Sequence, residues 1–339
     1  MAYGDTSTSS DNDGMMGMGM GMGMGMWLIT AIAIALTWSY LGRMFGRSFD
    51  LTDKSVLITG ASSGIGKALA LEYSNKGAKL LLVARRKSEL EAVAEECISV
   101  GAAGCIPIIA DVSTTEGCMI IQKEAEKALG KNNEGALDMV VLNAGISMGA
   151  SFTSLSKAGE AMDVMRRLMD VNYFGAVGVI DALLPLLQNS PTGVRILAVS
   201  SVVGLIAPPT RTGYAASKFA LKGFFDALRC ELIDSPNGSI VTLAYPGAVR
   251  TEINTSRLGL KSEKATALKL TKAMDPKRAA SIMVEAAARG QRDVMFSIDG
   301  TVGGAIKARV VRILGFFLPS LCDRIVISTT KAISTAAEE

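Results

Sequence analysis

Short apolar segments alternate with amphipathic segments along most of the chain, from residue 54 to about residue 300. The apolar segments have the length and continuity of strands that are buried on both faces. The segments expected as strands are Val56–Thr59, Lys79–Ala84, Cys105–Ala110, Leu137–Leu142, Val194–Ser200, Ser239–Ala244 and Val294–Ser297. Helical spacing fills the intervals, and the expected helices Gly66–Lys76 and Lys87–Val100 are each followed by a glycine, as is common just past a helix end. Together these predict one doubly wound α/β domain, a parallel sheet of about seven strands with helices on both faces.

The N-terminal end has a different pattern. Residues 1–14 are polar and rich in serine and aspartate, which predicts a disordered segment. A Met-Gly tract and an apolar run follow over residues 15–42, and no charged residue lies between Asp13 and Arg43. Because about 20 apolar residues cross a bilayer, this stretch is long enough to be a membrane anchor. Its most apolar part, Trp27–Leu41, is too short to span alone, so a spanning helix must also include part of the Met-Gly tract. Aspartates before it and arginines after it favour a main domain in the cytosol. A buried or disordered segment and a targeting peptide remain alternatives.

The other boundaries follow from composition. Residues 43–53 are expected to link the anchor to a catalytic domain over residues 54–300. The remainder, 301–339, mixes basic residues with the apolar run Ile313–Pro319 and predicts an amphipathic helical tail. Such a tail could lie on a membrane surface, or pack on its own domain or on a second subunit.

Composition excludes several kinds of chemistry. The 339-residue chain has no histidine, so a Ser-His-Asp triad and a histidine-ligated metal are both excluded. Its five cysteines are scattered, with no C-x-x-C pair, which argues against a zinc site and against a disulfide framework. A net charge of +3, with no basic run interleaved with aromatics, argues against nucleic-acid binding. Acid–base chemistry near neutral pH must then use tyrosine, lysine, cysteine or a carboxylate.

Two motifs suggest what that chemistry is. Thr59-Gly-Ala-Ser-Ser-Gly-Ile-Gly66 follows an expected strand and opens an expected helix. Glycines let the backbone approach a pyrophosphate, and free N–H groups at a helix N-terminus bind the anion. Far along the chain, Tyr214 and Lys218 are four residues apart, which places both on one face of a helix. A phenol titrates near pH 10, and a neighbouring ammonium can lower its pKa toward neutrality.

With Asn143-Ala-Gly145, Asn172, Ser201 and Pro246-Gly247, these motifs resemble the short-chain dehydrogenase/reductase family over roughly residues 51–297. The resemblance departs only at Leu142, where many members have a further asparagine. It implies a single Rossmann-type domain that forms a homodimer or homotetramer. By the same resemblance Tyr214 is the acid/base, Lys218 tunes it and holds the ribose, Ser201 polarises the substrate carbonyl and Asn172 supports a proton-relay water.

The resemblance also implies a nicotinamide cofactor. Its expected contacts are Gly60, Ser62, Ser63, Gly64, Ile65, Gly66, Arg85, Asp111, Val112, Asn143, Ala144, Gly145, Tyr214, Lys218, Pro246, Gly247, Val249 and Thr251. Cofactor choice follows from charge, because a ribose 2′-hydroxyl is usually held by a carboxylate and a 2′-phosphate by a cation. Ala84 stands where that carboxylate would be, and Arg85 and Arg86 follow it. This predicts NADP(H), unless the two arginines only cap the strand in solvent.

The sequence therefore predicts a membrane-anchored, NADP(H)-dependent oxidoreductase that interconverts a carbonyl and a secondary alcohol. The anchor and apolar composition suggest a lipophilic substrate, with steroids, retinoids, long-chain 3-keto lipids and ketosphingoids all open. The endoplasmic reticulum, with the domain facing the cytosol, is the expected location. The alternatives are a 3-oxoacyl thioester reductase of lipid synthesis, a catalytically silent nucleotide-binding scaffold and a membrane-tethering protein. The variable segment Glu252–Met274, expected to cover the substrate, does not choose among them.

Overall fold

The structure is a computed structural model that describes most of the chain between residues 48 and 296. The described residues are 48–130, 136–188, 190, 193–232, 239–254, 257–259 and 273–296, with Trp27, Thr30, Ala31, Ile34, Val310, Leu318, Ser320, Leu321 and 323–328. The chain divides into two compact units, Met1–Arg47 and Ser48–Glu339. In the first unit the four described residues are helical and exposed. The predictions for residues 1–14 and for most of the anchor, the tail and the variable segment lie outside the described residues.

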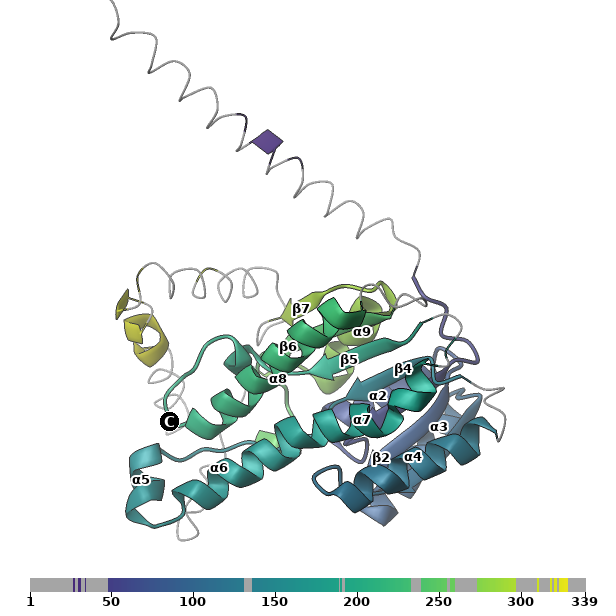
Figure 1. The fold of residues 1–339 in the computed structure, drawn as a ribbon, viewed down its shortest axis with the longest axis horizontal. Helices are drawn as coiled ribbons and strands as arrows, with labels where there is room; N and C mark the ends of the chain where they lie inside the picture. The colour runs from purple at the N-terminus through teal and green to yellow at the C-terminus, as the bar shows by residue number, and fades with distance from the viewer. Residues whose placement is uncertain are drawn as a thin grey trace, which may run out of the picture. The chain divides into compact units, whose positions relative to one another are not determined.

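Seven parallel strands form the centre of the second unit (Figure 1), as the sequence predicts. They are β1 (Ser55–Thr59), β2 (Lys79–Ala84), β3 (Gly104–Ile109), β4 (Met139–Leu142), β5 (Arg195–Val199), β6 (Ile240–Pro246) and β7 (Asp293–Phe296). Their order in the sheet is β3-β2-β1-β4-β5-β6-β7. Each strand begins and ends within two residues of its expected bounds, and the bounds of β2 are the expected ones.

Helices connect the strands and cover both faces of the sheet (Figure 1). The α-helices are α2 (Gly64–Ser74), α3 (Lys87–Ser99), α4 (Thr115–Leu129), α5 (Phe152–Lys157), α6 (Ala161–Met169), α7 (Gly175–Gln188), α8 (Thr212–Leu232) and α9 (Pro276–Ala288). A π-helical turn, η1 (Asp170–Phe174), and two 3₁₀ turns, η2 (Val202–Gly204) and η3 (Glu252–Asn254), complete the described elements. Helix α2 begins at Gly64, two residues earlier than expected.

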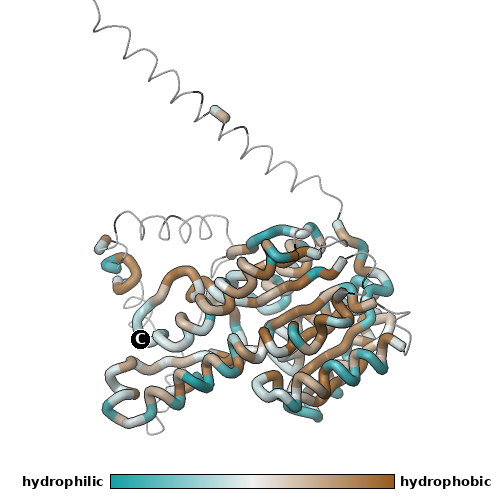
Figure 2. The backbone as a smooth tube through the Cα atoms, in the orientation of Figure 1, coloured by the Kyte–Doolittle hydropathy of each residue, from teal (hydrophilic) through white to brown (hydrophobic). Residues whose placement is uncertain are grey.

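The core forms two layers because successive strand residues point to opposite faces. In β1, Val56 and Ile58 belong to the layer under α2, α3 and α9, whereas Leu57 belongs to the layer under α4, α7 and α8. Figure 2 shows the strands as predominantly hydrophobic along their length, as expected for a sheet covered on both faces.

The strand order reverses direction between β1 and β4. Ligands of open α/β sheets bind in the crevice at the carboxyl ends of the strands at such a point. The loop after β1 is the glycine-rich motif at Gly60, and the loop after β4 begins at Asn143. The topology thus brings together two motifs that lie more than eighty residues apart in the chain.

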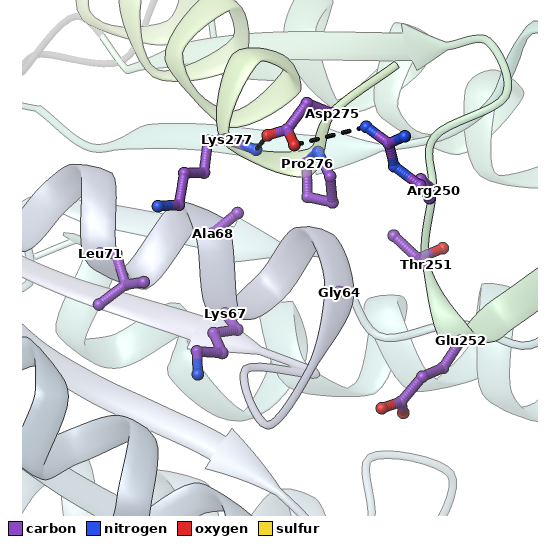
Figure 3. A pocket seen from close by; sticks show the side chains of 10 residues that line it. All are labelled: Gly64, Lys67, Ala68, Leu71, Arg250, Thr251, Glu252, Asp275, Pro276 and Lys277. Carbon is purple, nitrogen blue, oxygen red and sulfur yellow. Dashed lines mark hydrogen bonds and ion pairs between the residues drawn. The ribbon is translucent and has the colours of Figure 1, made fainter. Parts of the chain in front are cut away.

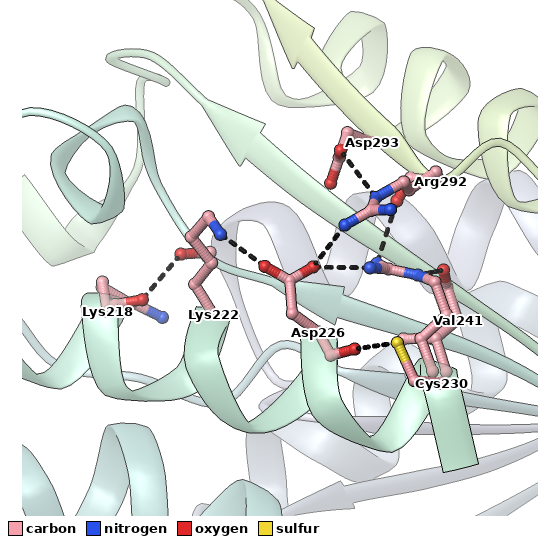
Figure 4. Close-up of polar contacts among 9 residues, drawn as sticks. Lys218, Lys222, Asp226, Cys230, Val241, Arg292 and Asp293 are labelled. Atoms are coloured by element: carbon pink, nitrogen blue, oxygen red, sulfur yellow. Dashed lines mark hydrogen bonds and ion pairs between the residues drawn. The ribbon is translucent and has the colours of Figure 1, made fainter. Parts of the chain in front are cut away.

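A polar cluster fixes α8 against the sheet (Figure 4). The Asp226 carboxylate pairs with Lys222 and Arg229 on its own helix. It also pairs, at 3.3 Å, with Arg292, the residue just before β7. Arg229 also donates from Nε to the carbonyl of Val241 in β6, at 3.0 Å. These contacts hold the helix that carries Tyr214 and Lys218.

Among the described residues, one continuous helical stretch is long and apolar enough to cross a membrane, Ala161–Leu187. It comprises α6, η1 and α7, and its side chains Val179, Ile180 and Leu183 belong to the core under the sheet. We therefore assign it to the folded domain.

Candidate active site

The glycine-rich loop is joined to the loop after β4 by hydrogen bonds. Thr59 Oγ1 accepts from the backbone N–H groups of Asn143, at 3.0 Å, and Ala144, at 3.1 Å. The Asn143 side chain donates back from Nδ2 to the carbonyls of Thr59, at 3.1 Å, and Gly60, at 3.2 Å. The predicted contacts Gly60, Asn143 and Ala144 therefore form one unit. Thr59 also belongs to this unit, although it was expected only as the first residue of the motif and not as a site residue.

Two glycines of the loop leave no room for a side chain. Gly60 has φ +66°, and a Cβ there would lie 2.8 Å from Ala144 Cα. A Cβ on Gly66 would lie 2.0 Å from the Gly60 carbonyl oxygen. The loop is thus folded tightly at the N-terminus of α2, whose first N–H groups suit a phosphate. This close folding, which a side chain at either glycine would disrupt, fits a loop that holds the pyrophosphate of a dinucleotide.

The two arginines after β2 have different partners. Arg86 donates from Nη2 to Ser63 Oγ at 2.7 Å and to Ser62 Oγ at 3.0 Å, and pairs through Nη1 with Glu252 at 3.3 Å. Arg85 instead lies 3.3 Å from the Asp111 carboxylate. Burial opposes ionisation of Asp111, but hydrogen bonds from Ser113 and the charge of Arg85 together lower its pKa.

The second arginine is therefore the cation held against the glycine-rich loop. The sequence predicts Arg85 as the cofactor contact, with Arg86 only as its neighbour. The structure adds Arg86, whose bonds to Ser62 and Ser63 depend on the strand order and not on a local pattern.

Tyr214, Ser201 and Lys218 come together at the carboxyl ends of the central strands. Ser201 follows β5, its Oγ accepts from Val203 N at 3.2 Å, and it lies close enough to Tyr214 to lower the pKa of that phenol. Lys218 Nζ donates to the carbonyl of Val199 at 3.0 Å and lies 5.9 Å from the centre of the Tyr214 ring. A Cβ on Gly145 would lie 3.6 Å from Lys218 Nζ, so the lysine lies beside the loop after β4.

The electrostatics of these groups follow from burial. Burial raises the pKa of Tyr214, and the nearby Ser201 side chain and the charges of Arg211 and Arg257 lower it part of the way back. Burial lowers the pKa of Lys218 to about 8. The lysine thus exchanges protons far closer to neutral pH than an exposed lysine does.

Asn172 lies in the π-helical turn η1 and is buried. Its Oδ1 accepts from Ile146 N at 2.8 Å, and its Nδ2 donates to Ile146 O at 3.0 Å and to Ser217 Oγ at 2.9 Å. The side chain therefore joins the loop after β4 to α8 beside Lys218. Turns of this kind often occur at functional sites.

The loop after β6 borders a pocket of about 500 Å³ on the outer side of α2 (Figure 3). Gly64 and Thr251, two expected cofactor contacts, line it, and a Cβ on Gly64 would lie 3.1 Å from Thr251. Its other lining residues include Lys67, Arg250 and Lys277 (Figure 3), and Tyr214 is not among them. Of the remaining expected contacts, Val112 and Pro246 are buried and Gly247 is half-buried at the ends of their strands.

Comparison with known proteins agrees with this geometry. A family model described as short chain dehydrogenase matches residues 54–259. The chain belongs to the short-chain dehydrogenase family.

Two relatives of the family illustrate the similarity. The chain is 39% identical over 206 residues to an "11-beta-hydroxysteroid dehydrogenase-like 2" of Arabidopsis thaliana, covering 61% of this chain and 62% of that protein. It is 38% identical over 252 residues to a "Dehydrogenase/reductase SDR family protein 7-like" of Anopheles gambiae, covering 73% of this chain and 76% of the other. The match to the first relative thus spans less than two thirds of its length.

Solved short-chain dehydrogenases have the same fold. An alcohol dehydrogenase of Thermococcus sibiricus complexed with 5-hydroxy-NADP is 25% identical with a TM-score of 0.60, covering 73% of this chain and 97% of that one. A Burkholderia phymatum member in complex with NAD is 22% identical with a TM-score of 0.66, covering 78% and 95%. The fold is thus one that binds nicotinamide cofactors, and the family is one of oxidoreductases acting on alcohol and carbonyl groups.

Proposed function

We propose that this protein is an NADP(H)-dependent oxidoreductase that interconverts a ketone and a secondary alcohol on a lipophilic substrate. The observation that carries the proposal is the meeting of Tyr214, Ser201 and Lys218 beside the loop that Asn143 ties to Gly60. One group of residues can exchange a proton, and the adjoining group can hold a dinucleotide. A bound nicotinamide cofactor supplies or accepts the hydride.

The chain's own residues supply the proton and the orientation. In ketone reduction, the Tyr214 hydroxyl donates its proton to the carbonyl oxygen, which the Ser201 hydroxyl also binds. The Lys218 ammonium, held by the Val199 carbonyl, stabilises the phenolate that remains. Asn172 positions the segment after β4 against α8 through its bonds to Ile146 and Ser217. Asn172 is also proposed to support a water molecule of the proton relay.

The charge near the second strand supports NADP(H) over NAD(H). Arg86 lies on the two loop serines, and the carboxylate that usually holds a 2′-hydroxyl is replaced by Ala84. Arginine binds phosphate through two parallel hydrogen bonds. Glu252 competes for the same guanidinium, so a 2′-phosphate would displace it. Arg85 is proposed as a second cation for this phosphate, and Asp111 with Val112 as contacts of the adenine.

An apolar cluster beside Tyr214 supports a lipophilic substrate. Met148, Leu155 and Leu168 are buried there, and Tyr214 and Leu258 pack against them. Relatives named for 11-beta-hydroxysteroids make steroid-like ketones a suitable first class to screen. Retinoids, long-chain 3-keto lipids and ketosphingoids are the other classes proposed.

We further propose attachment to the endoplasmic reticulum membrane through residues 15–42, with the catalytic domain in the cytosol, and assembly as a homodimer or homotetramer. Extraction of the full-length protein by detergent but not by high salt would support the anchor. Release by salt alone would contradict it.

The experiment that tests the function is turnover of steroid, retinoid and 3-keto lipid ketones by the full-length protein with NADPH or NADH. The proposal expects ketone reduction with NADPH, at a higher kcat/KM than with NADH. Equal use of both cofactors would contradict the role of Arg86. Absence of turnover with every ketone, in a protein that still binds a cofactor, would favour the catalytically silent nucleotide-binding scaffold.

A further inference from the structure

Arg211 has an unusual position beside Tyr214. It immediately precedes α8, and its carbonyl accepts the N–H of Ala215 at 2.7 Å. Its guanidinium donates from Nη1 to Ser147 Oγ, at 3.1 Å, and to the carbonyl of Met148. In the part of the chain that the structure describes, its Nε and Nη2 form no hydrogen bond and it belongs to no ion pair. Two of its three nitrogens are therefore available to a ligand.

Arg257 reaches the same place from the segment after β6. Its neighbour Leu258 forms a parallel bridge with Met148, accepting from Gly149 N at 2.9 Å and donating to Ser147 O at 2.7 Å. A Cβ on Gly149 would lie 3.2 Å from Arg257 Cδ, so the arginine lies over that glycine. Two arginines from distant segments thus meet over one short stretch of the loop after β4.

The two guanidinium groups influence each other and the tyrosine. Burial lowers the pKa of Arg211 to about 10, and the charge of Arg257 adds to this. The charge of Tyr214, when ionised, favours the protonated form of both arginines, so all three groups lie within electrostatic reach. The effect on Arg211 indicates that positive charge is concentrated here.

The N-terminus of α8 adds positive potential beside the two half-buried arginines, whose charges repel each other. The residue before Arg211, Thr210, has φ +63°, a left-handed conformation that is rare for a β-branched side chain. Strain of this kind persists where the surrounding structure imposes it, often at ligand sites.

We propose that Arg211 and Arg257 bind a negatively charged oxyanion, a carboxylate or a phosphate, carried by the substrate whose carbonyl reacts at Tyr214. The apolar cluster of Met148, Leu155 and Leu168 packs against the same tyrosine and suits the hydrocarbon part. The substrate is then an amphiphile, an oxo acid or the oxo thioester of an anionic carrier, and not a neutral sterol. This inference rests on the proposed function, because it takes Tyr214 as the residue at the reacting carbonyl.

Binding of matched probes to the full-length protein in detergent, saturated with NADP⁺, tests the inference. The probes are a series of long-chain oxo acids that differ in the spacing of ketone and carboxylate, each paired with its methyl ester. A 3-oxoacyl coenzyme A and the corresponding neutral N-acetylcysteamine thioester form a second pair. Calorimetric titration would compare the wild type with Arg211→Gln, Arg257→Gln, the double variant and Arg211→Lys. Arg278→Gln, an exposed arginine on α9, is the control.

We expect at least one acid to bind about tenfold or more tightly than its ester, a preference lost in the double variant and unchanged in Arg278→Gln. If only the oxo acids bind more tightly than their methyl esters, the bound group is a carboxylate. If only the coenzyme A thioester binds more tightly than its neutral partner, the bound group is a phosphate. Arg211→Lys should keep part of the preference, which a purely structural arginine would not explain.

Three results would overturn the inference. These are equal binding of every charged probe and its neutral partner, a preference that survives the double variant, and weakening of NADPH binding by the same factor as probe binding. The last would assign the arginines to the cofactor. A charge preference in a protein that reduces no ketone would contradict the proposed function, and it would also contradict the part of this inference that places the anion on a reacting substrate.

Discussion

Arg86 Nη2 lies 2.7 Å from Ser63 Oγ, so the end of the second strand is bonded directly to the glycine-rich loop. The guanidinium is exposed on its other side and shares Nη1 with Glu252. A dinucleotide held by this loop would therefore meet a cation within reach of its adenosine ribose.

Replacing this arginine should change cofactor choice. Arg86→Ala is expected to raise the Kd for NADPH roughly 10- to 100-fold, because a hydrogen bond to a charged group contributes about 1.5–3 kcal/mol. The Kd for NADH should change little. Fluorescence titration with both cofactors measures this, and Lys87→Ala, the adjacent exposed cation, is the control. Glu252→Gln should have the opposite effect and lower the Kd for NADPH, because the carboxylate no longer competes with the 2′-phosphate for Arg86. Loss of NADPH binding in that variant would contradict this competition.

The glycine cradle should tolerate no side chain. Gly66→Ala is expected to abolish binding of either cofactor, since its Cβ would overlap the Gly60 carbonyl at 2.0 Å. Gly223→Ala, in the interior of α8 with nothing within 4 Å, is the matched control and should leave binding intact and raise helix stability by about 0.5–1 kcal/mol. Cofactor binding by Gly66→Ala at the wild-type level would show that the loop is not the binding cradle.

The interior of the sheet could be read from the sequence because parallel strands buried on both faces are continuous apolar runs. The run Lys79–Ala84 has the same bounds in sequence and structure. The identities of the long-range partners could not be read, since no local pattern states that Arg86 meets Ser63 or that Arg211 meets the loop at Ser147. Those contacts depend on the strand order, which brings segments from distant parts of the chain to one edge.

Asn172 should be important for stability as well as for the site. Asn172→Ala is expected to lower the free energy of unfolding by about 2–4 kcal/mol, because it leaves the half-buried Ile146 amide and carbonyl groups without their partner. Chemical denaturation measures the change. Asn75→Ala, at the exposed end of α2, should change it by less than about 0.5 kcal/mol. An equal effect of both substitutions would mean that Asn172 does not hold α8 to the loop after β4.

Lys218 should make stability depend on pH. Its pKa falls from 10.5 in an exposed chain to about 8 on folding. Between these values the unfolded chain binds the proton and the folded protein does not, so the free energy of unfolding rises with pH across this window. Below about pH 8 the lysine is charged in both states, so this group gives no pH dependence there and the cost of burying its charge is present in full.

The measurement compares wild type and Lys218→Met by denaturation near pH 7.5 and near pH 9.5. We expect the wild type to gain on the order of 1–2 kcal/mol relative to the variant over this interval. Parallel pH profiles of the two proteins would contradict the assignment of a buried, neutralised lysine.

The direct test of the central claim is single-turnover reduction of a lipophilic ketone by NADPH-saturated protein, followed by nicotinamide absorbance, in the wild type and in Tyr214→Phe. The account predicts that the variant binds NADPH as the wild type does but loses reduction by a factor of about 100 or more, the upper part of the range for a positioned proton donor. Reduction by Tyr214→Phe at the wild-type rate would contradict it, because the proton would then come from another group.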